Sequence, residues 1–154
     1  MQLADRVSAN LEAPNPNRLM ILAPRKDYFE ELIRPLEWIN RIRRSIPPIQ
    51  AWKSHWPSSV TQFVIGPAKE TDMELLETSE KLINEKQLRR VYYSKFRPVP
   101  DTPFSNIPPE KPEREFRLYQ ASYLLRDYHF KLSELSFDTK GNLPLEYDPK
   151  YLWA

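Results

Sequence analysis

The chain has 154 residues, of which 40% are hydrophobic, 12% aromatic and 29% charged, and its formal net charge is +2. This composition allows a packed core in one domain and excludes wholesale disorder. The sequence contains no cysteine, which excludes disulfides and thiolate metal sites built from this chain alone. Its first ten residues, MQLADRVSAN, lack the apolar centre of a signal peptide, and no apolar run reaches the about 18 residues that span a bilayer. We therefore expect a cytoplasmic protein without a membrane partner.

The first half of the chain alternates strand and helix patterns. Residues 6–12, RVSANLE, alternate apolar and other residues, which predicts a strand. Apolar residues three or four apart predict a helix over residues 23–45, which Pro35 must kink or divide. The β-branched and aromatic run at residues 59–66, SVTQFVIG, predicts a buried strand.

The second half continues the alternation. A helix is predicted over residues 70–87, with Thr71 or Asp72 as its cap. The remaining predicted segments are a strand at 88–96, a proline-rich loop at 97–112, a helix at 113–130 and an irregular tail with a turn at 140–142. The order β-α-β-α-β-α predicts an α/β fold with a parallel sheet and right-handed crossovers. Three strands cannot close a barrel, so we expect one face of this sheet to be uncovered.

Ligands of parallel α/β folds bind beyond the carboxyl ends of the strands. At the end of the first predicted strand, Asn10 and Glu12 are two residues apart and therefore on one face. An amide beside a carboxylate can bind a vicinal diol such as that of a ribose. The alternative is a polar strand end that anchors the next loop.

The second predicted strand ends at Gly66, one of only two glycines. A glycine lets a flat ligand lie against the backbone, where the main-chain groups of Val64 and Ile65 can contact an adenine edge. The alternative is an ordinary strand-to-helix turn in which Glu70 complements the helix dipole. At the end of the third strand, Lys95 and Arg97 can meet a carboxylate or a phosphate, or they are solvated charges on a loop.

Basic and aromatic residues are interleaved near the end of the first predicted helix. Single-stranded nucleic acid is bound by this combination, because cations contact the backbone and rings stack on bases. The alternative is a basic helix end favoured by the dipole, with tryptophans that cover the core. The residues concerned are Arg41, Arg43, Arg44 and Lys53, with Trp38, Trp52 and Trp56.

Four segments, taken in order, resemble the later part of a radical S-adenosylmethionine (radical SAM) barrel. They are RVSANLEAP, TQFVIGPAKETD, RRVYYSKFRPVPDTPF and EFRLYQASYLLRDYHF. The plan is similar to that of biotin synthase, and the segments most resemble the radical SAM proteins linked to DNA modification or repair. The resemblance implies the C-terminal half of a partial (β/α)6 TIM-type barrel over residues 1–135. Residues 136–154 would be a connector towards a missing C-terminal element.

The resemblance also implies roles for individual residues. Asn10 and Glu12 match the Asn-x-Asp that holds the cofactor ribose, with Glu in place of Asp. Val64 and Gly66 match the later positions of a G-x-I-x-G motif whose backbone meets adenine, while Gln62 replaces the first glycine. The loop that begins at Val99 would lie beside the adenine.

The cofactor implied by the resemblance is S-adenosyl-L-methionine (SAM), a source of 5′-deoxyadenosyl radical chemistry on a substrate such as nucleic acid. The family's [4Fe–4S] cluster needs three cysteines in a Cys-x3-Cys-x2-Cys motif, and these would come from a complementary chain. We therefore expect no catalysis from this chain by itself. The alternative is a non-catalytic scaffold or nucleic-acid-binding module. In either case the faces and the edge left without neighbours predict self-association.

Overall fold

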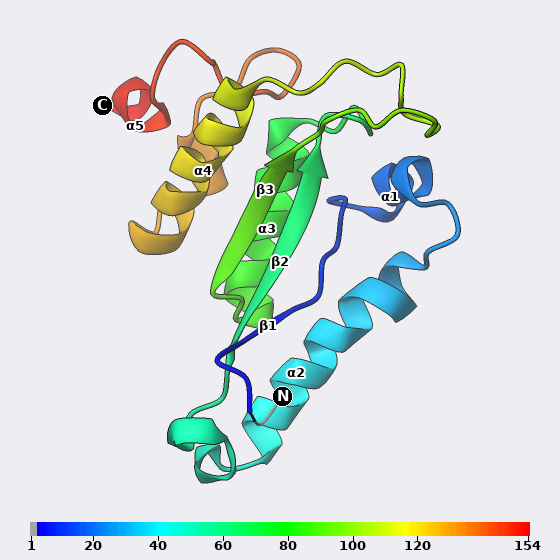
Figure 1. Cartoon of the computed structure of the whole chain (residues 1–154). Helices are drawn as coiled ribbons and strands as arrows, with labels where there is room; N and C mark the ends of the chain where they lie inside the picture. The colour runs from blue at the N-terminus through cyan, green and yellow to red at the C-terminus, as the bar shows by residue number, and fades with distance from the viewer. Residues whose placement is uncertain (1–2) are drawn as a thin grey trace.

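The computed structural model describes residues 3–154 and contains a parallel three-stranded sheet (Figure 1). The strands are β1 (Arg6–Ser8), β2 (Ser58–Ile65) and β3 (Arg90–Lys95), in the order β1-β2-β3. The main helices are α2 (Arg34–Ser45) and α3 (Asp72–Lys86), which connect the strands, and α4 (Pro112–Asp127), which follows β3. The predicted parallel α/β architecture is confirmed.

Several short helices complete the chain. Helix α1 (Pro16–Leu22) lies in a segment for which no element is predicted, and helix α5 (Pro149–Trp153) lies in the tail predicted to be irregular. A π-helix, η1 (Tyr28–Ile33), leads directly into α2. Pro35 lies in the first turn of α2, directly after the π-helix, so the chain changes helix type next to the proline but is not divided there. Single-turn 3₁₀ helices lie at Pro48–Gln50, Trp52–Ser54 and Leu132–Glu134.

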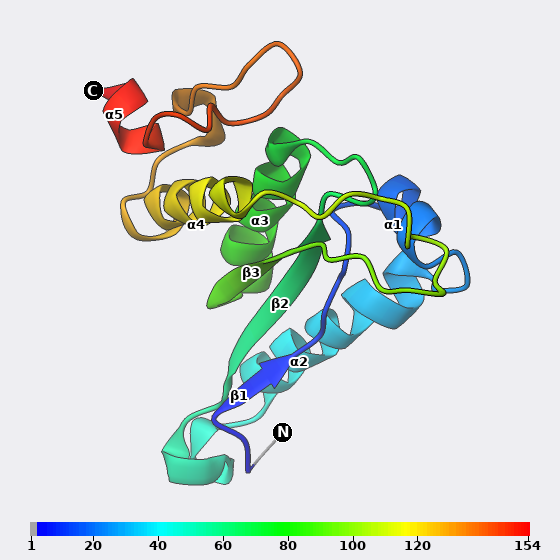
Figure 2. The ribbon, with the colours of Figure 1, turned by 45° about the horizontal axis from the view of Figure 1, so that its top comes forward.

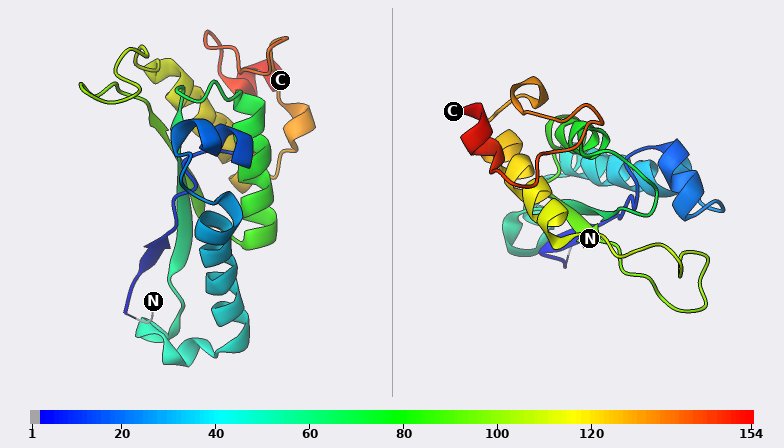
Figure 3. Two further views of the ribbon diagram at one scale, coloured as in Figure 1. Left: turned by 90° about the vertical axis from the view of Figure 1, so that its right-hand side faces the viewer. Right: turned by 90° about the horizontal axis from the view of Figure 1, so that it is seen from above.

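The helices gather on one face of the sheet (Figures 2 and 3). Side chains alternate across a strand, and those that face the helices are almost fully buried, among them Phe63, Val91 and Tyr93. On the opposite face, Val64 and Tyr92 remain partly exposed. A strand order that follows the chain order, with crossovers of one hand, places every connecting helix on the same side. The predicted uncovered face is therefore present.

Strand β1 is shorter than the predicted strand over residues 6–12. The main-chain N–H of Leu11 donates to the Thr61 hydroxyl at 3.1 Å, and this hydroxyl donates to the carbonyl of Ala9 at 2.7 Å. A side chain of β2 thus replaces two ladder hydrogen bonds, and regular pairing stops after Ser8. Pairing resumes at an isolated bridge between Glu12 and Phe63.

The edge of β3 is covered by α4. The hydroxyl of Tyr119 accepts a hydrogen bond from the N–H of Tyr93 and donates one to the Tyr93 carbonyl, both at 3.1 Å. One side chain therefore satisfies both main-chain groups of Tyr93, which an added strand would otherwise use.

The segment 136–154 packs against α3 and α4. The main-chain N–H of Met73 donates to the carbonyl of Gly141 at 2.9 Å, and Arg117 Nε donates to the carbonyl of Leu145 at 2.9 Å. Gly141 has a φ of +80°, which fits the predicted turn at residues 140–142. Within residues 3–154, no helix combines the length and the apolar character needed to cross a membrane.

Candidate functional site

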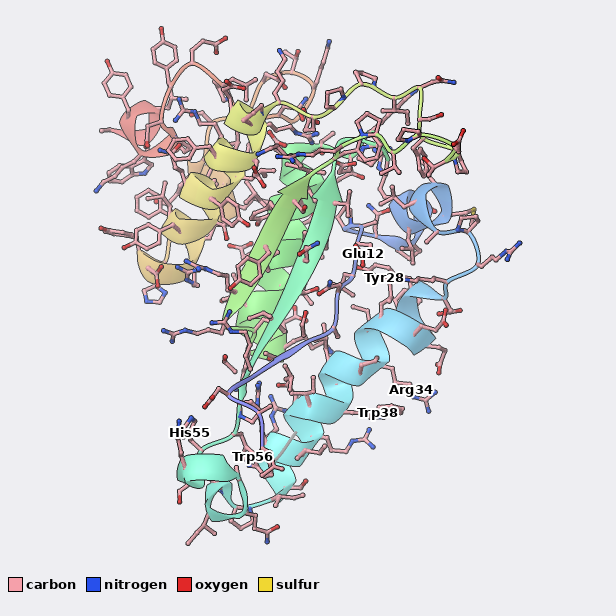
Figure 4. The ribbon with its side chains drawn as sticks, viewed as in Figure 1. Glu12, Tyr28, Arg34, Trp38, His55 and Trp56 are labelled. Carbon is pink, nitrogen blue, oxygen red and sulfur yellow. The ribbon has the colours of Figure 1, made fainter. Side chains whose placement is uncertain are left out.

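The residues predicted to hold a ribose and an adenine are brought together at the carboxyl ends of β1 and β2. The N–H of Glu12 donates to the carbonyl of Gln62 at 2.9 Å, and the N–H of Val64 donates to the carbonyl of Glu12 at 2.8 Å. Glu12 has a φ of +62°, so the chain turns here after the bridge. Its side chain is partly exposed beside β2 (Figure 4).

At this strand end, a buried residue separates the two predicted ribose ligands. Leu11 is fully buried, whereas Asn10 is exposed and Glu12 partly exposed. The Asn10 Oδ1 atom accepts a hydrogen bond from Ser8 Oγ at 2.5 Å. The turn that follows is fixed by Tyr28, whose hydroxyl donates to the carbonyl of Pro14 at 2.8 Å. Burial raises the pKa of Tyr28 to about 12, so this hydroxyl keeps its proton.

Gly66 allows a close approach, but the approaching group belongs to the protein. Its φ is +112°, a conformation that side chains disfavour. A Cβ atom at this position would lie 2.7 Å from Oε2 of Glu110. The Gly66 N–H donates to Oε1 of Glu70 at 2.5 Å. The space that the sequence assigned to a flat ligand is thus filled by the Glu110 carboxylate.

Three carboxylates surround one guanidinium next to this glycine. Arg114, in the first turn of α4, donates from Nε to Asp72 Oδ1 at 2.7 Å and from Nη1 to Glu110 Oε2 at 2.6 Å. Its Nη2 atom donates to the carbonyl oxygen of Glu70 at 2.7 Å. Arg114 Nη1 also lies 3.4 Å from Glu70 Oε1, within ion-pair distance. We call Glu70, Asp72, Glu110 and Arg114 the carboxylate–arginine cluster.

Burial sets the protonation of the cluster. The side chains of Glu70 and Asp72 are fully buried, and this burial raises the pKa of both carboxyls despite the nearby Arg114. Burial also disfavours the charge on Arg114, but its ion pairs outweigh that effect and raise its pKa. Oε2 of Glu70 has no hydrogen-bond partner among residues 3–154.

A cavity of about 740 Å³ lies over the cluster. Its floor includes Asp72 and Arg114, and Lys69, Lys111 and Lys140 stand around it. Asp72 also fixes one wall, because its Oδ2 accepts from the N–H of Leu143 at 2.9 Å. The cavity is within the usual range for ligand pockets, about 300–1,000 Å³. In the described part of the chain, no three His, Asp or Glu side chains form a group that could hold a metal ion.

The two predicted cations at the end of β3, Lys95 and Arg97, differ in their surroundings. Lys95 Nζ lies 2.8 Å from Oε2 of Glu115 on α4, so its charge is neutralised within the protein. Arg97 and Val99 are exposed in the loop that follows. This loop leaves and rejoins the sheet at Phe96, since the N–H of Glu110 donates to the Phe96 carbonyl at 3.0 Å.

The predicted nucleic-acid residues also differ in their surroundings. Arg43 is half-buried and donates to Ser59 Oγ at 2.9 Å and to the carbonyl of Pro57. Burial lowers the pKa of Arg43. Arg41 and Arg44 are exposed, while Lys53 Nζ lies 3.6 Å from Asp5 Oδ1.

The tryptophans beside these cations have separate partners, too (Figure 4). The Trp56 indole N–H donates to the carbonyl of Ile46 at 3.0 Å, which ties the ring to the end of α2. Trp38 is half-exposed, and the Arg34 guanidinium lies 5.5 Å from its ring centre. The side chain of Trp52 lies outside the described parts of the structure.

The carboxylate–arginine cluster was not predicted as a site from the sequence. Asp72 was expected as a possible cap, but Thr71 is the cap and forms a capping box with Glu74. For Glu70 the sequence indicates only an interaction with the helix dipole. Glu110 and Arg114 are one helical turn apart, a common surface pattern, and nothing in the sequence indicates that they meet Asp72.

Comparisons with protein-family models, with curated proteins and with solved structures find no match to the chain. The resemblance to radical SAM barrels therefore stays a prediction from the sequence.

Proposed function

We propose that the chain is the nucleoside-binding half of a radical SAM enzyme, built on the C-terminal half of a partial TIM-type barrel. The observation that carries the proposal is the main-chain hydrogen bond from Val64 to Glu12, beside the bridge between Glu12 and Phe63 at the carboxyl ends of neighbouring parallel strands. Two segments that the resemblance assigns to one nucleoside, far apart in the sequence, are adjacent in space. A parallel sheet with all its helices on one face is also the arrangement of a barrel wall.

The residues present fit the nucleoside part of SAM at one strand end. Asn10 is exposed and Glu12 is partly exposed, so an amide and a carboxylate are accessible to the two hydroxyls of a ribose. Val64 is on the helix-free face and partly exposed. Because Glu110 covers Gly66, and Ile65 is fully buried with its carbonyl bonded to the Phe96 N–H, the adenine would contact the chain at Val64. Arg97 and Val99 are exposed and available to the rest of the cofactor.

The residues present do not fit the [4Fe–4S] cluster, because the sequence holds no cysteine. SAM together with such a cluster supplies radical chemistry in this family, and this chain's share would be to bind and orient the nucleoside. A complementary chain with the Cys-x3-Cys-x2-Cys motif would complete the enzyme. Its substrate would be of the nucleic-acid class, with Arg41 and Arg44 as the free cations of the predicted basic segment.

Isothermal titration calorimetry with SAM tests the proposal on the isolated chain. We expect Glu12→Gln to weaken SAM binding about tenfold, since it removes one charge-assisted hydrogen bond to the ribose. Glu85→Gln, an exposed change of the same kind near the end of α3, serves as the matched control and should leave the affinity unchanged. Equal affinity of wild type and Glu12→Gln would count against the proposal.

A further inference from the structure

Four arginines line one small cavity at the amino ends of the strands, opposite the site described above. Arg6 begins β1, Arg89 and Arg90 stand at the start of β3, and Arg126 lies in the last turn of α4. The cavity has a volume of about 260 Å³ and includes Tyr92 and Asp127 in its lining. We call it the arginine cavity.

The strand register explains why these side chains converge. Val60 on β2 pairs with Ser8 on one side and with Arg90 on the other. Val60 is on the face without helices, yet only 4% of it is exposed, and it lines the arginine cavity. Arg6 and Arg90 stand over it from the two neighbouring strands.

Tyr92 holds two of the guanidinium groups in place. Arg6 Nη1 donates to the Tyr92 hydroxyl at 3.0 Å. The guanidinium of Arg90 lies 5.7 Å from the centre of the same ring, within cation–π distance. These contacts position both cations without neutralising either of them.

Positive charge in the arginine cavity exceeds negative charge. Arg126 Nη2 lies 2.5 Å from Asp127 Oδ2, so this pair is internally balanced. Arg6, Arg89 and Arg90 form no ion pair with any carboxylate of residues 3–154. Among the described residues, the cavity is thus lined by four guanidinium groups and a single carboxylate, that of Asp127. Arg6, Arg89 and Arg90 are all solvent-exposed, so water screens their mutual repulsion, and an anion in the cavity would gain the combined attraction of the three guanidinium groups.

We propose that the arginine cavity binds a phosphate group. Guanidinium groups donate paired hydrogen bonds that match the oxygens of a phosphate, and several of them around one anion give a tight, oriented site. The volume is below the about 300 Å³ of the smallest ordinary ligand pockets, so it suits a phosphate group rather than a whole nucleotide. The phosphate comes either from a small free phosphate compound or from the backbone of a single-stranded nucleic acid.

Arginine side-chain NMR tests the proposal on the full chain. Inorganic phosphate is titrated while the Nε–H signals are recorded, with chloride at the same ionic strength as the reference. We expect saturable shifts of the Arg6, Arg89 and Arg90 signals with phosphate but not with chloride. Arg90→Gln and, separately, Arg89→Gln should each weaken phosphate binding about tenfold. Arg25→Gln is the matched control, because it removes an exposed arginine elsewhere in the chain and should leave binding unchanged.

A second titration, with single-stranded oligodeoxythymidylate, separates the two sources. If the oligonucleotide shifts the same arginine signals and competes with inorganic phosphate for the site, a nucleic-acid backbone is supported as the source. Phosphate binding without oligonucleotide binding supports a small phosphate compound. Absence of phosphate-specific shifts, or an equal loss of binding in Arg25→Gln, would overturn the proposal. Circular dichroism shows whether Arg89→Gln and Arg90→Gln are folded. If one of them misfolds, the other still tests the proposal. The test is independent of SAM binding, which occupies the other end of the strands.

Discussion

Arg114 Nε donates to Asp72 Oδ1 over 2.7 Å, and this bond joins the first turn of α4 to the first residue of α3. The same guanidinium contacts Glu70 and Glu110, so one cation is in ion-pair contact with three carboxylates beside the end of β2. The geometry of this end of the sheet therefore depends on a single side chain.

Arg114→Met should destabilise the fold by about 3–5 kcal/mol, because it leaves two fully buried carboxylates without a cation. Urea unfolding measures the change. Arg25→Met, an exposed substitution of the same type, should stay within about 0.5 kcal/mol of wild type. Equal stabilities of the two variants would contradict a structural role for the cluster.

The raised pKa of Glu70 predicts a pH effect with a definite sign. A carboxyl whose pKa is higher in the folded state binds more protons folded than unfolded, at pH values between the two pKa values. In that window, which begins near the ordinary Glu pKa of 4.5 and extends upward, stability contributed by this group falls as pH rises. Glu70→Gln keeps an acceptor for the Gly66 N–H but does not titrate.

The stability difference between Glu70→Gln and wild type should therefore shift in favour of the variant as pH rises through this window. Urea unfolding at a series of pH values checks it. Other carboxyls, such as Glu74 and Asp138, have lowered pKa values and contribute the opposite slope, but they act equally in both proteins. A difference that stays constant with pH would contradict the raised pKa.

The two glycines offer a matched pair for testing local strain. In Gly141→Ala, the new Cβ would lie 3.4 Å from its nearest atom, Cβ of Thr71, which is an ordinary contact. The substitution should therefore lower the stability only through the strain of a positive φ, by about 1–2 kcal/mol. Gly66→Ala should cost more, since its Cβ would also lie 2.7 Å from Glu110 Oε2. Adding Glu110→Ala should restore part of the loss at Gly66 and none at Gly141. Thermal unfolding of the single and double variants gives the comparison, and equal losses at both glycines would speak against the contact.

Exposed aromatic side chains on α4 predict self-association. Phe116 and Tyr123 are 58% and 48% exposed, and the helix-free face of the sheet is not covered by the described residues. Light scattering should give a mass above the 18.4 kDa of one chain at high concentration, and Phe116→Ser with Tyr123→Ser should lower it. Because Tyr119 occupies the edge of β3, we expect association through faces rather than strand addition. A monomer at every concentration would be inconsistent with this expectation.

The regular elements could be predicted because their patterns are local. Val and Tyr in β3, the apolar spacing of α3 and Pro35 at the start of α2 each act within a few residues. Helix α1 was not predicted, although Asn15 caps it and Pro16 opens it, because the run APNPN at residues 13–17, with two prolines and two asparagines, also fits a loop.

The site could be predicted only where it follows strand topology. Glu12 and Val64 meet because parallel strands end at the same edge, which the order of the elements implies. The pairing of Arg114 with Asp72 depends on how two helices pack, and the end of β1 depends on one hydroxyl of Thr61. Long-range side-chain contacts of this kind leave no periodic signal in a sequence.

The most direct test of the proposed nucleoside site is a calorimetric comparison of adenosine with 2′,3′-dideoxyadenosine, which lacks the ribose diol. If Asn10 and Glu12 bind the diol, wild type should prefer adenosine, and Glu12→Gln should lose about tenfold in affinity for adenosine only. The same modest affinity for both nucleosides in wild type and variant, or no binding of either, would contradict the account.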